Sequence, residues 1–244
     1  MKKMHLIMPM GGKGSRFADK GFDFPKPLIE IAEKPFFYWS TMSITKFIEV
    51  VDITFVVLQE HIDKYNIDTE IRKYFSDAHI HVIPEVLNGA VLTCMEGLKG
   101  IHDDFSILFN DCDHMFRCKS FEQFMTNDEK IDGALLTFWS DEAKYSFLRF
   151  DENDNVIETV EKEVISNDAI CGCYYFANKA LFSETAEQYL KECQYKEFFV
   201  SGVYNVMAAY GNVVKAFQTD FHLSFGVPEE YEEAKDSPLF EELM

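Results

Sequence analysis

The loop that follows the first apolar run combines glycines with basic side chains, which are residue types that bind phosphate. Glycine allows positive φ angles, and successive N–H groups in such a backbone form a nest for an anion. A guanidinium fork and a lysine held between two prolines would add positive charge beside that nest. We therefore predict that this loop binds a nucleotide polyphosphate through Gly11, Gly12, Gly14, Ser15, Arg16 and Lys26.

The spacing within this loop differs from two common phosphate-binding motifs. A P-loop needs Gly-Lys-Ser/Thr after a four-residue gap, and a dinucleotide fingerprint opens directly into a helix; neither pattern is present. The alternative interpretation is a glycine-rich surface turn that leads into a proline-rich connector. The combination of Gly-x-Gly-Ser-Arg with Pro-Lys-Pro further along the loop favours the phosphate site.

A second group of polar side chains ends the apolar stretch 105–110. Asp111 and Asp113 stand one residue apart directly after Asn110. Ligands bind beyond the carboxyl ends of parallel strands, and two carboxylates there suit Mg²⁺, which bridges protein and phosphates. An acidic turn or a helix N-cap would also explain two aspartates in this position. We expect a Mg²⁺ site here and assign no proton transfer to His114.

The first half of the chain must position these groups, and it alternates apolar strands with helices. Such alternation indicates βαβ units around a parallel sheet. The expected strands are 5–9, 51–58, 79–84 and 105–110, and the expected helices are 35–47, 61–75 and 89–99.

The second half has strands in close succession before its helices. The expected strands are 133–140, 145–151, 155–162, 169–177 and 213–225, and the expected helices are 180–192, 198–211 and 228–235. No repeat or linker separates the halves. We therefore predict one domain, 1–244, in which a nucleotide-binding half, 1–117, and an acceptor-binding half, 118–244, share one sheet.

Composition argues against several other classes of protein. The formal net charge of −19 argues against nucleic-acid binding, which relies on a basic surface. The apolar runs are far shorter than the ~20 residues of a membrane span, and the N-terminus lacks the apolar stretch of a signal peptide. The six cysteines form no C-x-x-C pair and suit reduced core residues. We expect a cytoplasmic protein that binds neither nucleic acid nor membranes.

The glycine loop, the Pro-Lys-Pro segment and the paired aspartates together resemble the sugar-nucleotide pyrophosphorylases, a nucleotidyltransferase family that includes glucose-1-phosphate thymidylyltransferases. The likeness continues through matched segments to about residue 230. It implies an α/β fold, a Rossmann-like three-layer sandwich of the glycosyltransferase-A type with a mixed central sheet. Segments 166–176 and 197–206 also resemble a branch that serves capsule and surface polysaccharides.

The resemblance assigns nucleotide and metal roles. In the family the glycine loop wraps the nucleotide, while the arginine and lysine hold the triphosphate. Asp113 fits the metal-binding aspartate best, and Asp111 is the second choice. Gly89 would lie against the nucleobase. Asn88 would either bind a base edge or cap the following helix, and these two interpretations carry equal weight.

The resemblance also assigns acceptor roles. Glu161 would accept hydrogen bonds from acceptor hydroxyls, Lys162 would contact the acceptor phosphate, and Gly172 would leave room for a sugar ring. An ordinary solvated ion pair would equally explain Glu161 and Lys162. Ser146 stands where many relatives have glycine, which bears on the identity of the acceptor.

One departure from the family pattern concerns the second metal ligand. Relatives carry Asp-x-Gly-Thr-Pro where this chain has Ser224-Phe225-Gly226-Val227-Pro228, so a serine replaces a carboxylate. Asp220 or Asp111 would compensate for it, or the ion would depend more on phosphates and water.

The predicted reaction joins an NTP to a phosphorylated small molecule, most simply a sugar 1-phosphate, and releases pyrophosphate, for surface polysaccharide synthesis. CTP is slightly favoured over dTTP, GTP and UTP because several short relatives are cytidylyltransferases. The alternatives are a cytidylyltransferase for phosphocholine or a phosphorylated amino acid, a metal-dependent glycosyltransferase, and a non-catalytic nucleotide-binding module. The oligomeric state stays open, with a homo-oligomer as one option.

Overall fold

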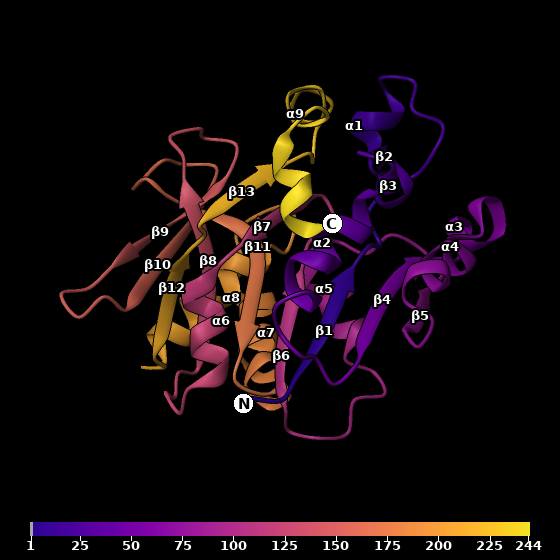
Figure 1. Ribbon diagram of the computed structural model, residues 1–244. Helices are drawn as coiled ribbons and strands as arrows, with labels where there is room; N and C mark the ends of the chain where they lie inside the picture. Colours follow the sequence, from indigo (N-terminus) through magenta and orange to yellow (C-terminus); the bar gives the residue numbers. More distant parts are fainter. Residues whose placement is uncertain (1) are drawn as a thin grey trace.

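The computed structural model describes residues 2–244, and a nine-stranded sheet forms its centre (Figure 1). The first half contributes β1 (Met4–Pro9), β4 (Ile53–Leu58), β5 (His79–Ile83) and β6 (Ser106–Asn110). These strands pair in parallel in the order β6-β1-β4-β5. Their carboxyl ends therefore meet at one edge, where open α/β sheets bind their ligands.

The second half adds five strands to the same sheet. They are β8 (Gly133–Trp139), β9 (Ser146–Phe150), β10 (Val156–Glu161), β11 (Asp168–Phe176) and β12 (Val214–Gln218). The long strand β11 runs antiparallel to β6 and so joins the two halves, while β12 runs parallel to β8. The predicted mixed sheet is confirmed.

Helices cover both faces of this sheet because side chains along each strand alternate between two cores. On one face, even-numbered residues of β1 pack with α2 (Phe36–Thr45), α4 (Ile67–Tyr74) and α6 (Lys119–Thr126). On the other face, Ile7 packs with α5 (Ala90–Gly97), α7 (Lys179–Glu192) and α8 (Val200–Ala209). Helix, sheet and helix thus form the predicted three layers.

A third, mostly aromatic core holds the glycine loop against the C-terminal part of the chain. Phe17 of α1 (Ser15–Ala18) packs edge-on to Tyr231 of α9 (Pro228–Ala234). Phe36 lies 4.6 Å from Phe225, measured between ring centres, and Trp39 lies 4.7 Å from Phe240 in the final 3₁₀ helix, Pro238–Leu243. Figure 1 shows α1 and α9 at the same end of the sheet.

Two predicted elements are divided in the structure. The helix expected over 61–75 consists of α3 (Gln59–Tyr65) and α4, because Asn66 between them has a φ of 51°, which ends a helix. The strand expected over 213–225 breaks after β12. Asp220 N donates to Arg117 O at 2.7 Å, and the chain turns away to pair β13 (Phe221–Ser224) with β7 (His114–Arg117).

Several short elements were not predicted from the sequence. They are α1, α6, β7, a two-stranded sheet of β2 (Glu30–Ile31) with β3 (Lys34–Pro35), and the 3₁₀ helix Lys26–Leu28. Each is eight residues or shorter, so hydrophobic periodicity gives little signal for it.

The cysteines agree with the expectation from composition. All six cysteines have free thiols, and five of them are buried. Burial raises the pKa of the Cys94 and Cys173 thiols well above the usual value, so these residues act as small apolar core residues. Within residues 2–244, no helix has both the length and the apolar character that crossing a membrane demands.

Candidate active site

A cavity of about 1240 Å³ lies where the carboxyl ends of β1 and β6 meet β10 and β11. The glycine loop, the turn between β6 and β7, and the start of α5 form much of its wall. The structure brings every residue that the sequence analysis named for the site to this wall: Gly11, Gly12, Gly14, Ser15, Arg16, Lys26, Asn88, Gly89, Asp111, Asp113, Ser146, Glu161, Lys162 and Gly172. Their individual roles stay predictions.

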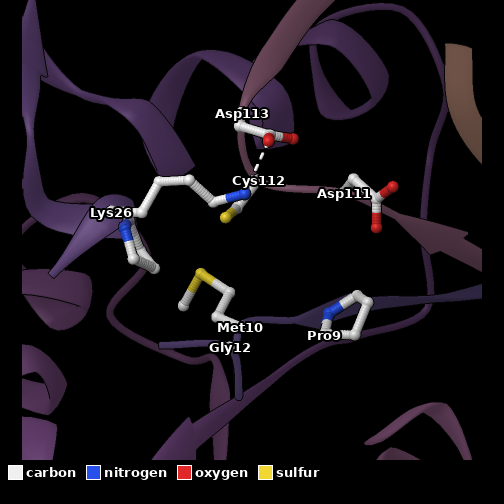
Figure 2. Close-up of a pocket in the computed structure, with 8 residues that line it drawn as sticks. Pro9, Met10, Gly12, Lys26, Asp111, Cys112 and Asp113 are labelled. Carbon is white, nitrogen blue, oxygen red and sulfur yellow. Dashed lines mark hydrogen bonds and ion pairs between the residues drawn. The ribbon is translucent and has the colours of Figure 1, made fainter. Parts of the chain in front are cut away.

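Lys26 and Asp113 form an ion pair in a side pocket of this cavity (Figure 2). Lys26 Nζ lies 2.6 Å from Asp113 Oδ2, and the two side chains are 27% and 22% exposed. Burial lowers the pKa of Lys26, but the charge of Asp113 outweighs it, and the pKa is raised. Burial raises the pKa of Asp113, but the charge and hydrogen bond of Lys26 outweigh it, and the pKa is lowered. Both groups are therefore charged at neutral pH.

Asp111 occupies the same wall in a different electrostatic state. Burial and then the charge of Asp113 raise its pKa to about 7, against the opposing charge of Lys26. Figure 2 shows its carboxylate on the far side of Asp113 from Lys26. A group with this pKa is half protonated near neutral pH, so a cation in the cavity would readily convert it to the carboxylate.

Gly172 packs directly against Asp111. Its φ is +94°, and a Cβ at this position would lie 2.7 Å from Asp111 Oδ2. The pairing of β11 shifts register between Ile170 and Tyr174, which places Gly172 in a bulge whose carbonyl accepts from Asp111 N at 2.9 Å. Bulges of this kind re-aim the chain next to functional sites. The bare Cα thus makes room for the Asp111 carboxylate, in addition to any room it leaves for a ligand.

The glycine loop folds back onto Lys26. Gly14 has a φ of +60°, and a Cβ there would lie 2.9 Å from Lys26 Cβ. A Cβ on Gly11 would lie 2.6 Å from Ile83 Cδ1, whereas Gly12 has no neighbour within 4 Å of such an atom. Arg16 also lines the cavity and makes no ion pair with any residue in the range 2–244. Its guanidinium is therefore available to a ligand.

The start of α5 forms the wall that the resemblance assigns to the nucleobase. Gly89 has a φ of +107° and lies against the backbone of Phe198, where a Cβ would approach the Phe198 nitrogen to 2.3 Å. Helix α5 begins after Gly89, and no side chain caps its first turn. The capping interpretation of Asn88 is therefore wrong, and its side chain stays a candidate for binding a base edge.

Lys162 has an unusual backbone at the end of β10. Its φ is +58°, its N–H donates to Tyr145 O at 2.9 Å, and its Nζ lies 5.4 Å from the centre of the Phe199 ring. Such a conformation costs a non-glycine residue free energy and persists only where its surroundings impose it. Lys162 is itself exposed, and the left-handed turn and the aromatic contact fix where its side chain lies on the cavity wall.

The charged or polar residues of the cavity wall that the sequence analysis missed include Lys144, His222 and Glu230. Glu230 is 8% exposed and accepts from Ser224 Oγ at 2.6 Å and from Gly226 N at 3.0 Å. Tyr145 donates to its other oxygen at 2.8 Å, and Lys144 Nζ lies 3.0 Å from the same oxygen. The sequence signal, an acidic first turn in a short helix, does not indicate which glutamate faces inward.

The structure excludes one of the two aspartates that were named as compensating for Ser224. Asp220 does not line the cavity, and its carboxylate accepts from Lys119 N at 2.8 Å, so Asp220 does not take the place of the missing carboxylate. Asp111, the other candidate named from the sequence, does lie on the cavity wall.

His114 belongs to a buried hydrogen-bonded chain. Asn110 Nδ2 donates to Ser40 O, so Asn110 Oδ1 accepts from His114 Nε2 at 3.1 Å. His114 Nδ1 must then accept from His222 Nε2 at 3.2 Å. Burial lowers the pKa of His114 to about 4, so the ring is neutral.

The donor set near Asp113 fits a Mg²⁺ ion that is shared with substrate. A Cβ on Gly226 would lie 2.5 Å from Asp113 Oδ2, so this glycine leaves the space around that carboxylate open. Within residues 2–244 no three His, Cys, Asp or Glu side chains cluster as a metal site would require. Mg²⁺ is commonly held by one or two carboxylates together with substrate phosphates and waters. Asp111 and Asp113 would supply the carboxylates.

A model of the nucleotidyl transferase family matches residues 5–237. A relative from Campylobacter jejuni subsp. jejuni serotype O:2 is named D-glycero-alpha-D-manno-heptose 1-phosphate guanylyltransferase. It is 28% identical over 233 residues, which cover 93% of this chain and 97% of the relative.

Two solved structures are also similar. One is a nucleoside-diphosphate-sugar pyrophosphorylase from Vibrio cholerae RC9, with a TM-score of 0.81, 21% identity, and coverage of 95% of this chain and 100% of that one. The other is an inositol-1-phosphate CTP transferase from T. maritima, with a TM-score of 0.76, 15% identity, and coverage of 100% and 94%. Both share the fold of this chain.

Proposed function

The chain belongs to the nucleotidyl transferase family, and on that premise we propose that it joins an NTP to a sugar 1-phosphate. The products would be a nucleoside diphosphate sugar and pyrophosphate. The named Campylobacter relative transfers a nucleotide to a heptose 1-phosphate, which supports a sugar phosphate as the acceptor over phosphocholine or a phosphorylated amino acid.

The observation that carries the proposal is a single cavity in which two groups of residues meet. Arg16 and Lys26 provide positive charge on the wall formed by the glycine loop. Glu161 and Lys162 provide an acceptor of hydrogen bonds and a second cation on the wall formed by β10. The first wall suits a triphosphate, and the second suits the hydroxyl groups and phosphate of a sugar phosphate. One cavity of about 1240 Å³ has room for the two substrates together.

In the proposed reaction an oxygen of the acceptor phosphate attacks the α-phosphorus of the NTP. The bond from that phosphorus to the bridging oxygen breaks, and pyrophosphate leaves. The acceptor phosphate is ionised at neutral pH, so no side chain has to remove a proton. Arg16 and Lys26 would stabilise the charge of the leaving pyrophosphate, and Lys162 would align the attacking phosphate.

Asp111 and Asp113 are the residues that would hold Mg²⁺ in this reaction. When bound, Mg²⁺ offsets negative charge on the phosphates of the nucleotide. Lys26, paired with Asp113 at 2.6 Å, keeps this carboxylate ionised. The protein thus presents a ready metal ligand beside the wall that is proposed to bind the triphosphate.

GTP is the first nucleotide to test, because the curated relative is named a guanylyltransferase. CTP, which the sequence slightly favoured, is the second, and the T. maritima structure is named for CTP transfer. The Val86–Gly89 segment lines the cavity beside the proposed base site.

The test measures pyrophosphate release from GTP, CTP, UTP and dTTP with Mg²⁺ and a panel of hexose and heptose 1-phosphates. The wild-type protein should release pyrophosphate with at least one pair. Lys26→Met should lower kcat/KM by about 100-fold or more, as loss of a preorganised charge at a transition state does. Lys64→Met is the matched control, since Lys64 is exposed and pairs only with Glu60.

The double variant Lys26→Met/Asp113→Asn separates catalysis from folding. Lys26→Met alone leaves Asp113 partly buried and unpaired, which should cost about 2 kcal/mol of unfolding free energy. The double variant should recover stability and stay inactive. Full activity of either variant, or turnover only with a ready-made nucleoside diphosphate sugar, would contradict the proposal; the second result would indicate a glycosyltransferase.

A further inference from the structure

The Glu161 carboxylate receives two hydroxyl donors on the same oxygen. Ser146, its cross-strand partner at the start of β9, donates from Oγ to Oε1 at 2.5 Å. Ser201, in the first turn of α8, donates from Oγ to the same Oε1. A carboxylate oxygen has two lone pairs, so both acceptor positions of Oε1 are used within the protein.

The second carboxylate oxygen is in the opposite situation. Among residues 2–244, no group donates a hydrogen bond to Glu161 Oε2. Glu161 lines the cavity, as do its neighbours Ser146 and Lys162. A polar atom in such a place takes its hydrogen bonds from water or from a ligand. Oε2 is therefore the oxygen that a bound acceptor can use.

The helix that carries Ser201 is fixed firmly to the strand that carries Glu161. Thr159 N donates to Asn205 Oδ1 at 2.7 Å, and Asn205 Nδ2 donates back to Thr159 O at 2.9 Å. Thr159 Oγ1 donates to the Ser201 carbonyl at 2.8 Å. These three bonds set the position of α8 relative to β10, and with it the distance from Ser201 to Glu161.

Ser201 is placed to act on the acceptor only through Glu161. It is 1% exposed and does not line the cavity. Gly202 beside it presses α8 onto α7, because a Cβ there would lie 2.4 Å from the Tyr189 ring. The Ser201 hydroxyl thus supports Glu161 from behind the cavity wall.

We infer that Ser146 and Ser201 are positioning residues that fix Glu161 so that Oε2 accepts a hydrogen bond from a hydroxyl group of the acceptor. The inference rests on the proposed function and adds that the acceptor carries a hydroxyl group that reaches Glu161 Oε2. A carboxylate oxygen in a fixed position accepts a hydrogen bond only from a hydroxyl group that approaches along its lone pair. A quaternary ammonium group requires only a nearby negative charge. The two serines also remove the rotamer entropy that a free glutamate would lose when the acceptor binds.

The test is a set of serine variants in two backgrounds. Ser146→Ala, Ser201→Ala and the double variant are assayed by pyrophosphate release, with the sugar 1-phosphate and NTP that the wild-type protein uses. Each single variant should raise the KM for the sugar 1-phosphate about fivefold to tenfold and leave the KM for the NTP unchanged. In a Glu161→Ala background, removing either serine should change nothing further, because the group that they hold is gone.

Ser166→Ala is the matched control. Ser166 is a half-buried serine in the connection between β10 and β11, donates to Leu148 O at 2.7 Å, and does not line the cavity. It should leave both KM values unchanged. The inference is overturned if Ser201→Ala raises both KM values together, or if its effect is as large in the Glu161→Ala background as in the wild-type protein.

Crystal structures separate this inference from the proposed function. If the wild-type protein releases pyrophosphate with none of the pairs tested, the proposed function fails. Structures of the wild-type protein and of Ser146→Ala/Ser201→Ala still decide whether the serines position Glu161. A Glu161 carboxylate that keeps its place in the double variant would overturn the positioning role, and one that turns away would support it.

Discussion

At the scale of single residues, the contact between Gly172 and Asp111 shows how the backbone controls a carboxylate in the cavity. Asp111 owes its pKa of about 7 first to burial and then to Asp113. Part of that burial comes from the β11 bulge, whose glycine lies against the carboxylate. Any side chain on residue 172 would have to displace Asp111 or shift the bulge.

Gly172→Ala should therefore damage activity more than stability. The added Cβ would lie 2.7 Å from Asp111 Oδ2, and the φ of +94° would be strained for alanine. We expect about 1–2 kcal/mol of lost unfolding free energy from the backbone and at least a tenfold fall in kcat from displacement of Asp111. Chemical unfolding and pyrophosphate release measure the two effects.

Gly100→Ala separates these contributions. Gly100 has a φ of +98°, close to that of Gly172, and a Cβ on Gly100 would meet no atom within 4 Å. This variant should lose a similar amount of stability and keep the wild-type kcat. Equal kcat values for the two variants would show that the approach to Asp111 is unimportant.

At the scale of elements, Glu230 joins two segments on the rim of the cavity. It lies in the first turn of α9 and accepts from Ser224 and Gly226 just before that helix. It also accepts from Tyr145 and pairs with Lys144, both in the connection between β8 and β9. One carboxylate thus ties the β8–β9 connection to the end of β13, on the wall that also carries the proposed acceptor site.

Glu230→Gln should loosen this connection. Burial raises the pKa of Glu230, but hydrogen bonds from Ser224, Lys144 and Tyr145 outweigh it, and the pKa is lowered. The carboxylate is therefore the form that stabilises the fold, at pH values above its usual pKa. Replacing it should cost about 1–2 kcal/mol, a partial value because Lys144 is 40% exposed. Hydrogen exchange should become faster in residues 140–146.

Glu232→Gln on the same helix is the control for this variant. Glu232 is exposed and pairs only with Lys235, three residues on. Such surface pairs contribute about 0.5 kcal/mol or less, so neither stability nor exchange in residues 140–146 should change measurably. Equal exchange rates in both variants would mean that Glu230 does not hold the connection.

The elements also explain which parts of the site were predictable from the sequence. The glycine loop, the Asp111–Asp113 pair and the Glu161–Lys162 pair are each contiguous, so their residue types could be recognised locally. Glu230, Ser201 and Lys144 reach the site only through long-range packing: β13 on β7, α8 on β10, and the β8–β9 connection on α9. Ser201 is 40 residues from Glu161 in the chain, and Tyr145 is 85 residues from Glu230.

In the sheet, too, local patterns were predictable from the sequence and long-range contacts were not. All nine strands of the sheet are five residues or longer, and their apolar or alternating patterns predicted them, whereas the mixed arrangement was implied by the family resemblance. The break between β12 and β13 depends on Asp220 bonding to Arg117 and Lys119, which are about a hundred residues earlier, and no local signal marks it. Contacts between residues so far apart in the chain could not be predicted from the sequence.

At the scale of the whole molecule, the end of the sheet away from the cavity is held by one histidine. His5 lies at the start of β1 and is 2% exposed. Its Nδ1 and Nε2 each lie 2.8 Å from a carboxylate oxygen, the first from Asp52 and the second from Asp103. Asp52 precedes β4 and Asp103 precedes β6, so His5 links the amino ends of three adjacent parallel strands.

This link makes stability depend on pH. Burial lowers the pKa of His5, but the hydrogen bonds and charges of Asp52 and Asp103 outweigh it, and the pKa is raised. A raised pKa means that the folded protein binds the proton more tightly than the unfolded chain does. The contribution of His5 is therefore complete below its unfolded pKa of about 6.5 and is lost as pH rises through the folded value.

His5→Asn should lower the unfolding free energy by about 1–2 kcal/mol at pH 6, a discounted value because both carboxylates are partly exposed. The difference between variant and wild type should shrink as pH rises through the folded pKa of His5, above which the imidazole is neutral and donates to only one of the two carboxylates. His79→Asn, at the exposed start of β5, is the control, because His79 pairs with no carboxylate of residues 2–244. Urea unfolding at several pH values measures this, and a difference that stays constant from pH 6 to 9 would mean that His5 stabilises the three strands without its charge.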